Sequence, residues 1–483
     1  METMLMPQFV HMYKVNENYI ALFNSLTLDI LYCSQQAIKI SGRKIQYNGT
    51  NGSLLEMKKM TVITNEEAEA LITENIKKCA IMRDRNVTKF LYIVPTVQCN
   101  LNCTYCHIQH GRENRKSVSM NVPTLIRGLD IFKSYGGFEE ENGEIMYYGG
   151  EPFLEPDFLL KSLEMIRSYS SKIKITIFTN GTLITEELAE KLKKYKLYVI
   201  VSMDGRESAH DAARIEKGGA PSYKKAEKGY RYLQKAGIDV GISLVAGTHN
   251  IDRLEEEVWY LADELRPLDI GISTLHLFPH SKNPNEVDIN RLTEKLQSVQ
   301  MEMRKKGVYI EHLFRKIRPF VEKSRRLYDC PSCNSKLLIT PWDTIGFCEA
   351  FMEEEKYFYA TKGFCLDKCS DRNDWKMRVP LTNRECYSCP AVSICGGGCP
   401  YDAFCETGNI CKKDSRRCLQ SRKMVKWLCN DLFQILEENG RIAGQDIYEP
   451  SMEERKLLYG NVELNDRIPL QNYSKSNEDI NEI

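Results

Sequence analysis

The chain has 483 residues, and its 66 basic and 66 acidic side chains give a formal net charge of zero at pH 7. This length exceeds one ordinary core and predicts two or three domains, and the balanced charge argues against a general affinity for nucleic acid or anionic membranes. Because we find no apolar run as long as a signal peptide core or a membrane-spanning helix, we expect a cytoplasmic protein with no membrane partner.

Cysteine usage points to metal chemistry. There are 18 cysteines, and in a chain that is not expected to be secreted they favour metal ligation over disulfides. Three lie in one loop near residue 100, thirteen fall between Cys330 and Cys429, and only Cys33 and Cys79 stand apart. We therefore expect two metal-binding regions.

The first 85 residues predict a small α+β domain. Residues 19–27 alternate like a strand, and residues 30–34 predict a second one. A helix is expected to begin near Thr64-Asn65-Glu66-Glu67, where the residue types match a capping box. The domain could bind a partner, or it could be a scaffolding hairpin that covers the next domain.

Residues 86–315 predict repeated βα units, because apolar strand-like runs alternate with amphipathic helical stretches. The expected strands are residues 89–94, 144–148, 173–179, 198–203, 239–245 and 269–277, and the expected helices include residues 157–169, 186–194, 223–236 and 252–265. Six such units suit either a partial barrel or a doubly wound open sheet. A full eight-stranded barrel is not expected, because the chain becomes basic and then cysteine-rich after Glu311.

The loop after the first expected strand contains Cys99, Cys103 and Cys106, with Tyr105 before the last cysteine. Three thiolates can hold three corners of a cubane iron-sulfur cluster and leave the fourth iron open to a small molecule. A zinc knuckle is the alternative, because His107 and His110 are near enough to supply a fourth ligand.

The following strand ends carry motifs suited to a small ligand. They are Tyr148-Gly149-Gly150-Glu151-Pro152, Thr179-Asn180-Gly181-Thr182, Ser202-Met203-Asp204-Gly205 and His210-Asp211-Ala212-Ala213-Arg214. Two glycines let a ligand approach backbone carbonyls, and the Glu151 carboxylate can accept a hydrogen bond from an ammonium. For Ser202 and Arg214, a helix cap and a surface ion pair are the alternatives.

The C-terminal third contains a dense thiol cluster with the spacing Cys-x2-Cys-x5-Cys-x3-Cys, formed by Cys386, Cys389, Cys395 and Cys399. Upstream stand Cys330, Cys333 and Cys348, and downstream Cys418. A zinc ribbon is the alternative explanation for this region.

These motifs resemble the radical SAM superfamily, and the C-terminal third resembles its SPASM domain. The resemblance implies an α/β fold: a partial (β/α)6 TIM-type barrel at residues 86–315, a SPASM domain at 316–430, and a helix end and tail at 431–483. It implies S-adenosylmethionine and three 4Fe-4S clusters. The first cluster would be held by Cys99, Cys103 and Cys106, and the two auxiliary clusters by Cys330, Cys333, Cys348 and Cys399, and by Cys386, Cys389, Cys395 and Cys418. The cofactor contacts would be Tyr105, Gly149, Gly150, Glu151, Thr179, Asn180, Ser202 and Arg214.

Two departures from the family pattern stand out. Asp343 occupies the position of a family glycine five residues before Cys348, and a glycine occurs instead at Gly346. Five cysteines are surplus to the ligand sets, and we interpret them as buried thiols: Cys365, Cys369, Cys405, Cys411 and Cys429. Glu349, directly after Cys348, stands where some relatives carry an acidic residue that removes a proton, and it is the candidate catalytic residue.

The family resemblance implies an enzyme that modifies a ribosomally made precursor peptide, with leader and core, most simply by joining a cysteine sulfur to a carbon as a thioether. Formylglycine formation in a sulfatase, and carbon–carbon or ether crosslinking of a peptide, are the alternatives. An iron-sulfur electron carrier is the non-enzymatic alternative. Residues 1–85 loosely resemble a winged-helix-like domain that pairs a strand edge with the leader. A flavodoxin or ferredoxin is the expected reductant, and nucleic acid is not an expected partner.

Overall fold

The computed structural model describes residues 3–49, 54–84, 88–109, 118–139, 143–278, 282–352 and 357–464. His110 and the polar segment after residue 464 lie outside these residues, so the zinc ligand and the mobile tail expected there are not described.

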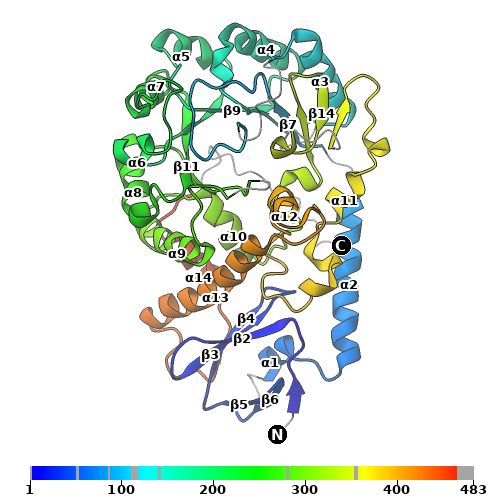
Figure 1. Cartoon of the computed structure of the whole chain (residues 1–483). Helices are drawn as coiled ribbons and strands as arrows, with labels where there is room; N and C mark the ends of the chain where they lie inside the picture. Colours follow the sequence, from blue (N-terminus) through cyan, green and yellow to red (C-terminus); the bar gives the residue numbers. More distant parts are fainter. Residues whose placement is uncertain are drawn as a thin grey trace.

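Among the described residues, one sheet of nine strands organises the molecule (Figure 1). Its first six strands in chain order are parallel and adjacent: β7 (Phe90–Ile93), β8 (Glu144–Tyr147), β9 (Lys174–Thr179), β10 (Tyr198–Ser202), β11 (Asp239–Ala246) and β12 (Ile270–Thr274). All six were predicted from the sequence. Strand order follows chain order without a reversal, whereas a doubly wound sheet reverses direction once. The partial barrel is therefore confirmed and the open sheet is wrong.

Helices cover the outer face of this sheet, as Figure 1 shows for the upper part of the molecule. They are α3 (Val122–Ser134), α4 (Pro156–Tyr169), α5 (Glu186–Lys193), α6 (Glu207–Asp211), α7 (Tyr223–Lys235) and α8 (Leu254–Leu265). Each long helix buries one apolar stripe, as α4 does with Leu159, Leu163 and Ile166. The four helices expected here are confirmed.

The sheet continues into the cysteine-rich region, and this extension of the sheet was not predicted from the sequence. Strand β13 (Lys336–Ile339) pairs in parallel with β7, and β14 (Thr344–Gly346) and β15 (Phe358–Ala360) extend the sheet as antiparallel strands. The remaining elements here are short: η4 (Pro331–Cys333), η5 (Glu349–Phe351), η7 (Leu366–Lys368), α11 (Arg372–Lys376), η8 (Pro380–Thr382), η9 (Arg384–Cys386) and α12 (Pro400–Thr407).

Asp343 makes the turn between β13 and β14. Its backbone adopts φ 61°, in the left-handed region that glycine adopts most easily and that Asp tolerates better than most residues. The Asp343 carboxylate lies 2.7 Å from Nη2 of Arg127 on α3. The departure from the family glycine therefore leaves a tight hairpin in place.

The N-terminal residues form two small antiparallel sheets and two helices. The elements are β1 (Thr3–Leu5), β2 (Val10–Lys14), β3 (Tyr19–Asn24), β4 (Ile30–Ser34), β5 (Ile38–Ser41), β6 (Lys44–Tyr47), α1 (Leu54–Met60) and α2 (Asn65–Asp84). One sheet has the order β1-β6-β5 and the other β16-β4-β3-β2. The two strands and the helix expected here are confirmed.

Three further helices join the parts of the molecule. Helices α9 (Ile289–Lys305) and α10 (Glu311–Glu322) follow the barrel, and α13 (Ser415–Glu438) crosses between the barrel and the N-terminal sheets (Figure 1). After α13, strand β16 (Ile447–Tyr448) pairs with β4, and α14 (Met452–Arg455) and η10 (Lys456–Tyr459) follow.

Candidate functional site

The cysteine loop is held against the Gly149-Gly150 turn by backbone contacts. The Gly150 N–H donates to Thr96 O at 3.0 Å, and the Glu151 N–H donates to Gln98 O at 2.7 Å. A Cβ at residue 150 would lie 1.9 Å from Gln98 O. We expected the glycines to make room for a ligand, and Gly150 instead makes room for the chain that carries Cys99.

Glu151 differs from its expected role. Its side chain is 1% exposed, and its carboxylate accepts hydrogen bonds from Asn180 N at 2.7 Å, Thr179 Oγ1 at 2.8 Å and Phe153 N at 3.1 Å. Burial raises the pKa of Glu151 to about 7. Because protein donors occupy most of its acceptor positions, Glu151 fixes the turn after β9 and is poorly placed to receive an ammonium.

Asn180 connects that turn to the cysteine loop. Its Nδ2 donates to Asn100 Oδ1 at 2.9 Å and lies 3.6 Å from Cys99 Sγ. Ser202 is half-buried at the carboxyl end of β10, paired with Ser243 on β11. The predicted contacts from β8, β9 and β10 thus all lie at the same end of the sheet as the three thiols.

The segment around Arg214 clamps the other side of the cysteine loop. The Asn102 N–H donates to Ile215 O at 2.7 Å, and the Thr104 N–H donates to Ala213 O at 3.0 Å. These contacts place the Arg214 segment beside Cys103.

Arg214 is not a surface residue. Its side chain is 9% exposed, its Nε lies 3.0 Å from Asp204 Oδ2, and its guanidinium lies 5.4 Å from the ring centre of Tyr105. Asp204 also accepts from the Tyr105 hydroxyl and from Val245 N. Burial would raise the pKa of Asp204, but Arg214 and His249 hold it well below its usual range. The surface ion pair considered for Arg214 is therefore wrong, and Asp204 is the residue that fixes Arg214.

The three loop cysteines are half-buried, and burial raises the pKa of Cys99 to about 11 and that of Cys103 to about 12. Zinc ligands must approach one another closely. Within the described residues, no three such groups at this loop lie within 4.8 Å of one another, because the one compact group is His276, Cys399 and Asp402. His107 packs against His276 at 4.8 Å between ring centres. The loop suits a larger cluster better than a zinc ion.

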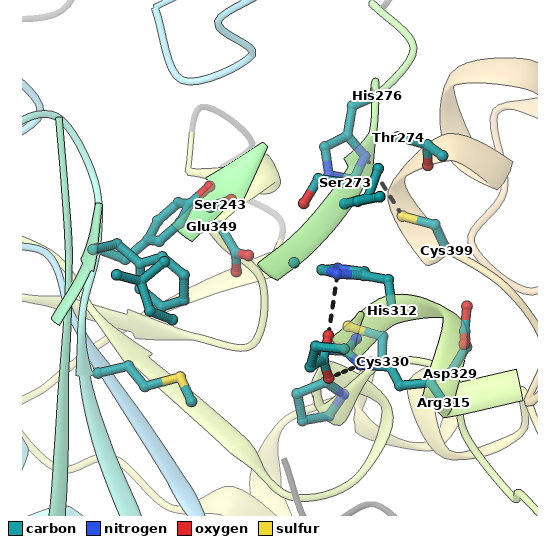
Figure 2. A pocket seen from close by; sticks show the side chains of 18 of the residues that line it. Ser243, Ser273, Thr274, His276, His312, Arg315, Asp329, Cys330, Glu349 and Cys399 are labelled. Carbon is teal, nitrogen blue, oxygen red and sulfur yellow. Dashed lines mark hydrogen bonds and ion pairs between the residues drawn. The ribbon is translucent and has the colours of Figure 1, made fainter. Parts of the chain in front are cut away.

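A cavity of about 300 Å³ lies inside the barrel, lined by residues of its strands and of the cysteine-rich region (Figure 2). Its wall from β7, β8 and β9 is mainly aromatic and apolar, with Tyr92, Met146, Tyr148 and Phe178. Its opposite wall is polar, and includes Ser243, Ser273, Thr274, His276 and His312. The cavity extends to three cysteines of the first auxiliary set, which are Cys330, Cys348 and Cys399. The fourth, Cys333, is buried near Cys330 and does not line it.

The second auxiliary set gathers separately. Cys386, Cys389, Cys395 and Cys418 line one small cavity of about 50 Å³ together with Cys411. The two cysteine sets alternate along the sequence, but in the structure they lie at two separate cavities. Of the other surplus cysteines, Cys429 is buried under Tyr32, whose hydroxyl donates to Cys429 O at 2.7 Å. Cys365, Cys369 and Cys405 line neither cavity, and only Cys369 of these three is buried. Cys411 is exposed, so its interpretation as a buried thiol is wrong.

Glu349 lines the large cavity and forms an ion pair with Lys336, the first residue of β13. Burial alone would raise the pKa of Glu349, but the Lys336 ammonium lowers it below its usual value. Glu349 is therefore an ionised carboxylate beside Cys348. Lys336 was not a sequence candidate, because nothing near it in the sequence suggests this partner.

Comparison with known proteins identifies the chemistry of the cysteine loop. Residues 93–260 match the radical SAM superfamily. The protein is a radical SAM enzyme. Its cofactors are accordingly S-adenosylmethionine and a 4Fe-4S cluster.

Several similar proteins cover most of the chain. The radical SAM cyclopropyl synthase TigE of Paramaledivibacter caminithermalis is 23% identical over 377 residues, 75% of this chain and 76% of TigE. A structure of anSMEcpe with bound AdoMet superposes with a TM-score of 0.60 at 18% identity, over 74% of this chain and 96% of that one. Streptococcus suis SuiB bound to precursor peptide SuiA superposes with a TM-score of 0.52 at 18% identity, over 86% and 99%. The two structures share the fold of this radical SAM enzyme. In the described part of this chain, no helix is both long and apolar enough to cross a membrane.

Proposed function

We propose that this radical SAM enzyme modifies a ribosomally made peptide by joining a cysteine sulfur to a carbon, forming a thioether. The observation that carries the proposal is the barrel cavity lined by Cys330, Cys348 and Cys399 and also by His276, whose ring contacts His107 directly after the cysteine loop. One substrate residue inside it could face both the radical source and the auxiliary thiols.

The cysteine loop and the strand ends provide the SAM site. Cys99, Cys103 and Cys106 would hold the cluster, which would supply a 5′-deoxyadenosyl radical when SAM is bound. The backbone carbonyls of the Gly149-Gly150 turn suit the amino group of SAM. Arg214, fixed by Asp204, and Ser202 suit its carboxylate and ribose. Asn180 and Tyr105 complete the wall around the loop.

Forming a C–S bond from a C–H and an S–H group removes two hydrogens. One leaves the carbon as a hydrogen atom, and the other leaves the thiol as a proton, so one electron must also depart. Glu349 is the base available for the proton, since Lys336 keeps it ionised beside the auxiliary thiols. The two auxiliary thiol groups would hold 4Fe-4S clusters that accept the electron.

The N-terminal sheets are the element available for the leader. Strand β2 lies at the edge of its sheet, and Met12 on it is 47% exposed. A leader could add a strand there through main-chain hydrogen bonds. A flavodoxin or ferredoxin would supply electrons to the enzyme.

The test is anaerobic incubation of the reconstituted full chain with SAM, dithionite and a cysteine-containing precursor peptide encoded beside its gene. We expect 5′-deoxyadenosine, and a peptide that is two hydrogens lighter and whose cysteine no longer reacts with iodoacetamide. A lighter peptide whose thiol still reacts would indicate a carbon–carbon or ether crosslink. Conversion of the cysteine to an aldehyde would indicate formylglycine, and absence of 5′-deoxyadenosine would leave only an electron carrier.

Glu349→Gln separates radical formation from product formation. We expect it to leave 5′-deoxyadenosine formation in place while lowering peptide product by roughly 100-fold, the usual cost of losing a general base. Glu144→Gln is the matched control in the same cavity, because burial raises the pKa of Glu144 to about 7 and the amide resembles its protonated form. Equal losses in the two variants would exclude Glu349 as the base.

A further inference from the structure

His276 lies where the barrel meets the cysteine-rich region (Figure 2). It follows β12 and lines the large cavity, and its Nδ1 lies 3.1 Å from Asp402 Oδ1 and 3.9 Å from Cys399 Sγ. In the part of the chain that the structure describes, these three side chains form the one compact group of potential metal ligands. This group was not predicted from the sequence, because strand β12 and helix α12 are more than a hundred residues apart.

Asp402 is rigidly held on α12. Its side chain is fully buried, it accepts from Leu277 N at 2.9 Å, and its Oδ2 lies 3.1 Å from Nη2 of Arg416. A carboxylate can only accept here, so the Nδ1–H of His276 points at Asp402 and fixes the ring. This is the arrangement in which a carboxylate orients a histidine next to a metal site.

Cys399 receives one backbone N–H group directly and lies beside the His276 N–H that donates to Asp402. The Asp402 backbone N–H lies 3.5 Å from Cys399 Sγ, and the imidazole Nδ1–H lies between the sulfur and the carboxylate. Hydrogen bonds to the sulfur ligands of an iron-sulfur cluster stabilise its reduced, more negative state, and a nearby carboxylate opposes it. His276 should therefore raise the reduction potential of a cluster bound by Cys399, and Asp402 should lower it.

We propose that His276 and Asp402 are positioning residues that set the reduction potential of the first auxiliary cluster through Cys399. The inference rests on the proposed function, in which Cys399 is a cluster ligand. Because His276 also contacts His107 beside the SAM loop, the second auxiliary cluster, whose cysteines line a separate cavity, serves as the internal reference in the same sample.

The experiment is a redox titration of the anaerobically reconstituted full chain, followed by EPR spectroscopy. His276→Leu removes the N–H and should lower the potential of one auxiliary cluster, whereas Asp402→Asn removes a negative charge and should raise it. His276→Gln keeps an N–H donor and should stay near the wild type. His11→Gln, on β2 and outside both cysteine-lined cavities, is the matched control and should shift nothing.

Unchanged auxiliary potentials in both His276→Leu and Asp402→Asn, at full iron content, would overturn the proposal. Shifts of the same sign in these two variants would also overturn it, because they would indicate general disturbance. If His276→Leu fails to retain iron, the other two variants still test the proposal. His276→Gln should leave the auxiliary potential near the wild-type value, and Asp402→Asn should raise it. A wild type that binds iron for only one cluster would refute the auxiliary ligand sets themselves, and this is seen before any variant is made.

Discussion

The cysteine loop is held in place at individual residues, and mainly by their backbone atoms. Gly150 shows this most sharply, because the chain carrying Cys99 passes directly over its Cα. The contact leaves no space for a methyl group, and the atom in its way is a backbone oxygen that has no alternative rotamer. The position of Cys99, the first ligand of the proposed cluster, therefore depends on the absence of a side chain at residue 150.

Gly150→Ala should displace the cysteine loop and lower the iron retained by the SAM site. Gly218→Ala is the matched control, because nothing lies within 4 Å of its added Cβ and its φ is not positive. We expect the Gly150 variant to lose most of the EPR change caused by SAM, and the Gly218 variant to keep it. Full retention of that change in Gly150→Ala would show that the loop can move without cost.

Residues whose role depends on local spacing were visible in the sequence, and residues whose role depends on a distant partner were not. The three loop cysteines and the Gly-Gly-Glu-Pro turn are short patterns. Asp204 was quoted within a motif, but its partners Tyr105 and His249 are 99 and 45 residues away. Glu151 shows the reverse case, since its motif was recognised while the donors that occupy its carboxylate were not foreseen.

At the level of elements, the β13–β14 hairpin shows how the chain departs from its family without changing shape. Asp343 replaces a glycine in the left-handed region, and its side chain then binds Arg127 and Thr361 across the neighbouring elements. An acceptor at this position thus offsets part of the backbone strain.

Asp343→Val should destabilise the protein by about 1–2 kcal/mol, because a β-branched residue is disfavoured in the left-handed region. Asp343→Asn should stay within about 0.5 kcal/mol of the wild type, since Asn tolerates this conformation and the lost ion pair is partly exposed. Thermal unfolding of the reconstituted protein measures both. Equal destabilisation by Val and Asn would assign the effect to the ion pair with Arg127 instead of to backbone conformation.

The regular elements of the barrel could be predicted because each has enough length to show its period. Strand β11 and helix α7 have eight and 13 residues. Strands β13, β14 and β15 have four, three and three residues, and their partners are β7 and one another. A run as short as Lys336-Leu337-Leu338-Ile339 does not distinguish a strand from a short helix, so the extension of the sheet was missed.

At the scale of the whole molecule, the segment after α13 packs against the N-terminal sheet. Strand β16 pairs with β4, and Arg455 is 1% exposed, with its guanidinium donating to Leu28 O at 2.8 Å and also to Phe320 O. The segment after α13 therefore joins the N-terminal sheet to α10, which is more than a helix end and tail.

Truncation after Gly440 should lower the unfolding temperature and expose the N-terminal sheet to protease, because it removes β16 and Arg455. Truncation after Leu464 keeps all of these contacts and is the matched control. Limited proteolysis followed by mass spectrometry locates the first cuts. If both truncated chains are cut at the same rate and sites as the full chain, the C-terminal segment does not stabilise the N-terminal domain.

The parallel pairing of β13 with β7 has one more consequence. Strand β7, which precedes the cysteine loop, and β13, which follows Cys330 and Cys333, belong to one hydrogen-bonded ladder. A ladder resists shear, so we expect the cysteine loop and the segment with Cys330 and Cys333 to keep a constant separation during turnover. The substrate peptide would then have to bend to bring its two reacting residues together. The enzyme would accept only peptides in which the segment between these residues has a suitable length.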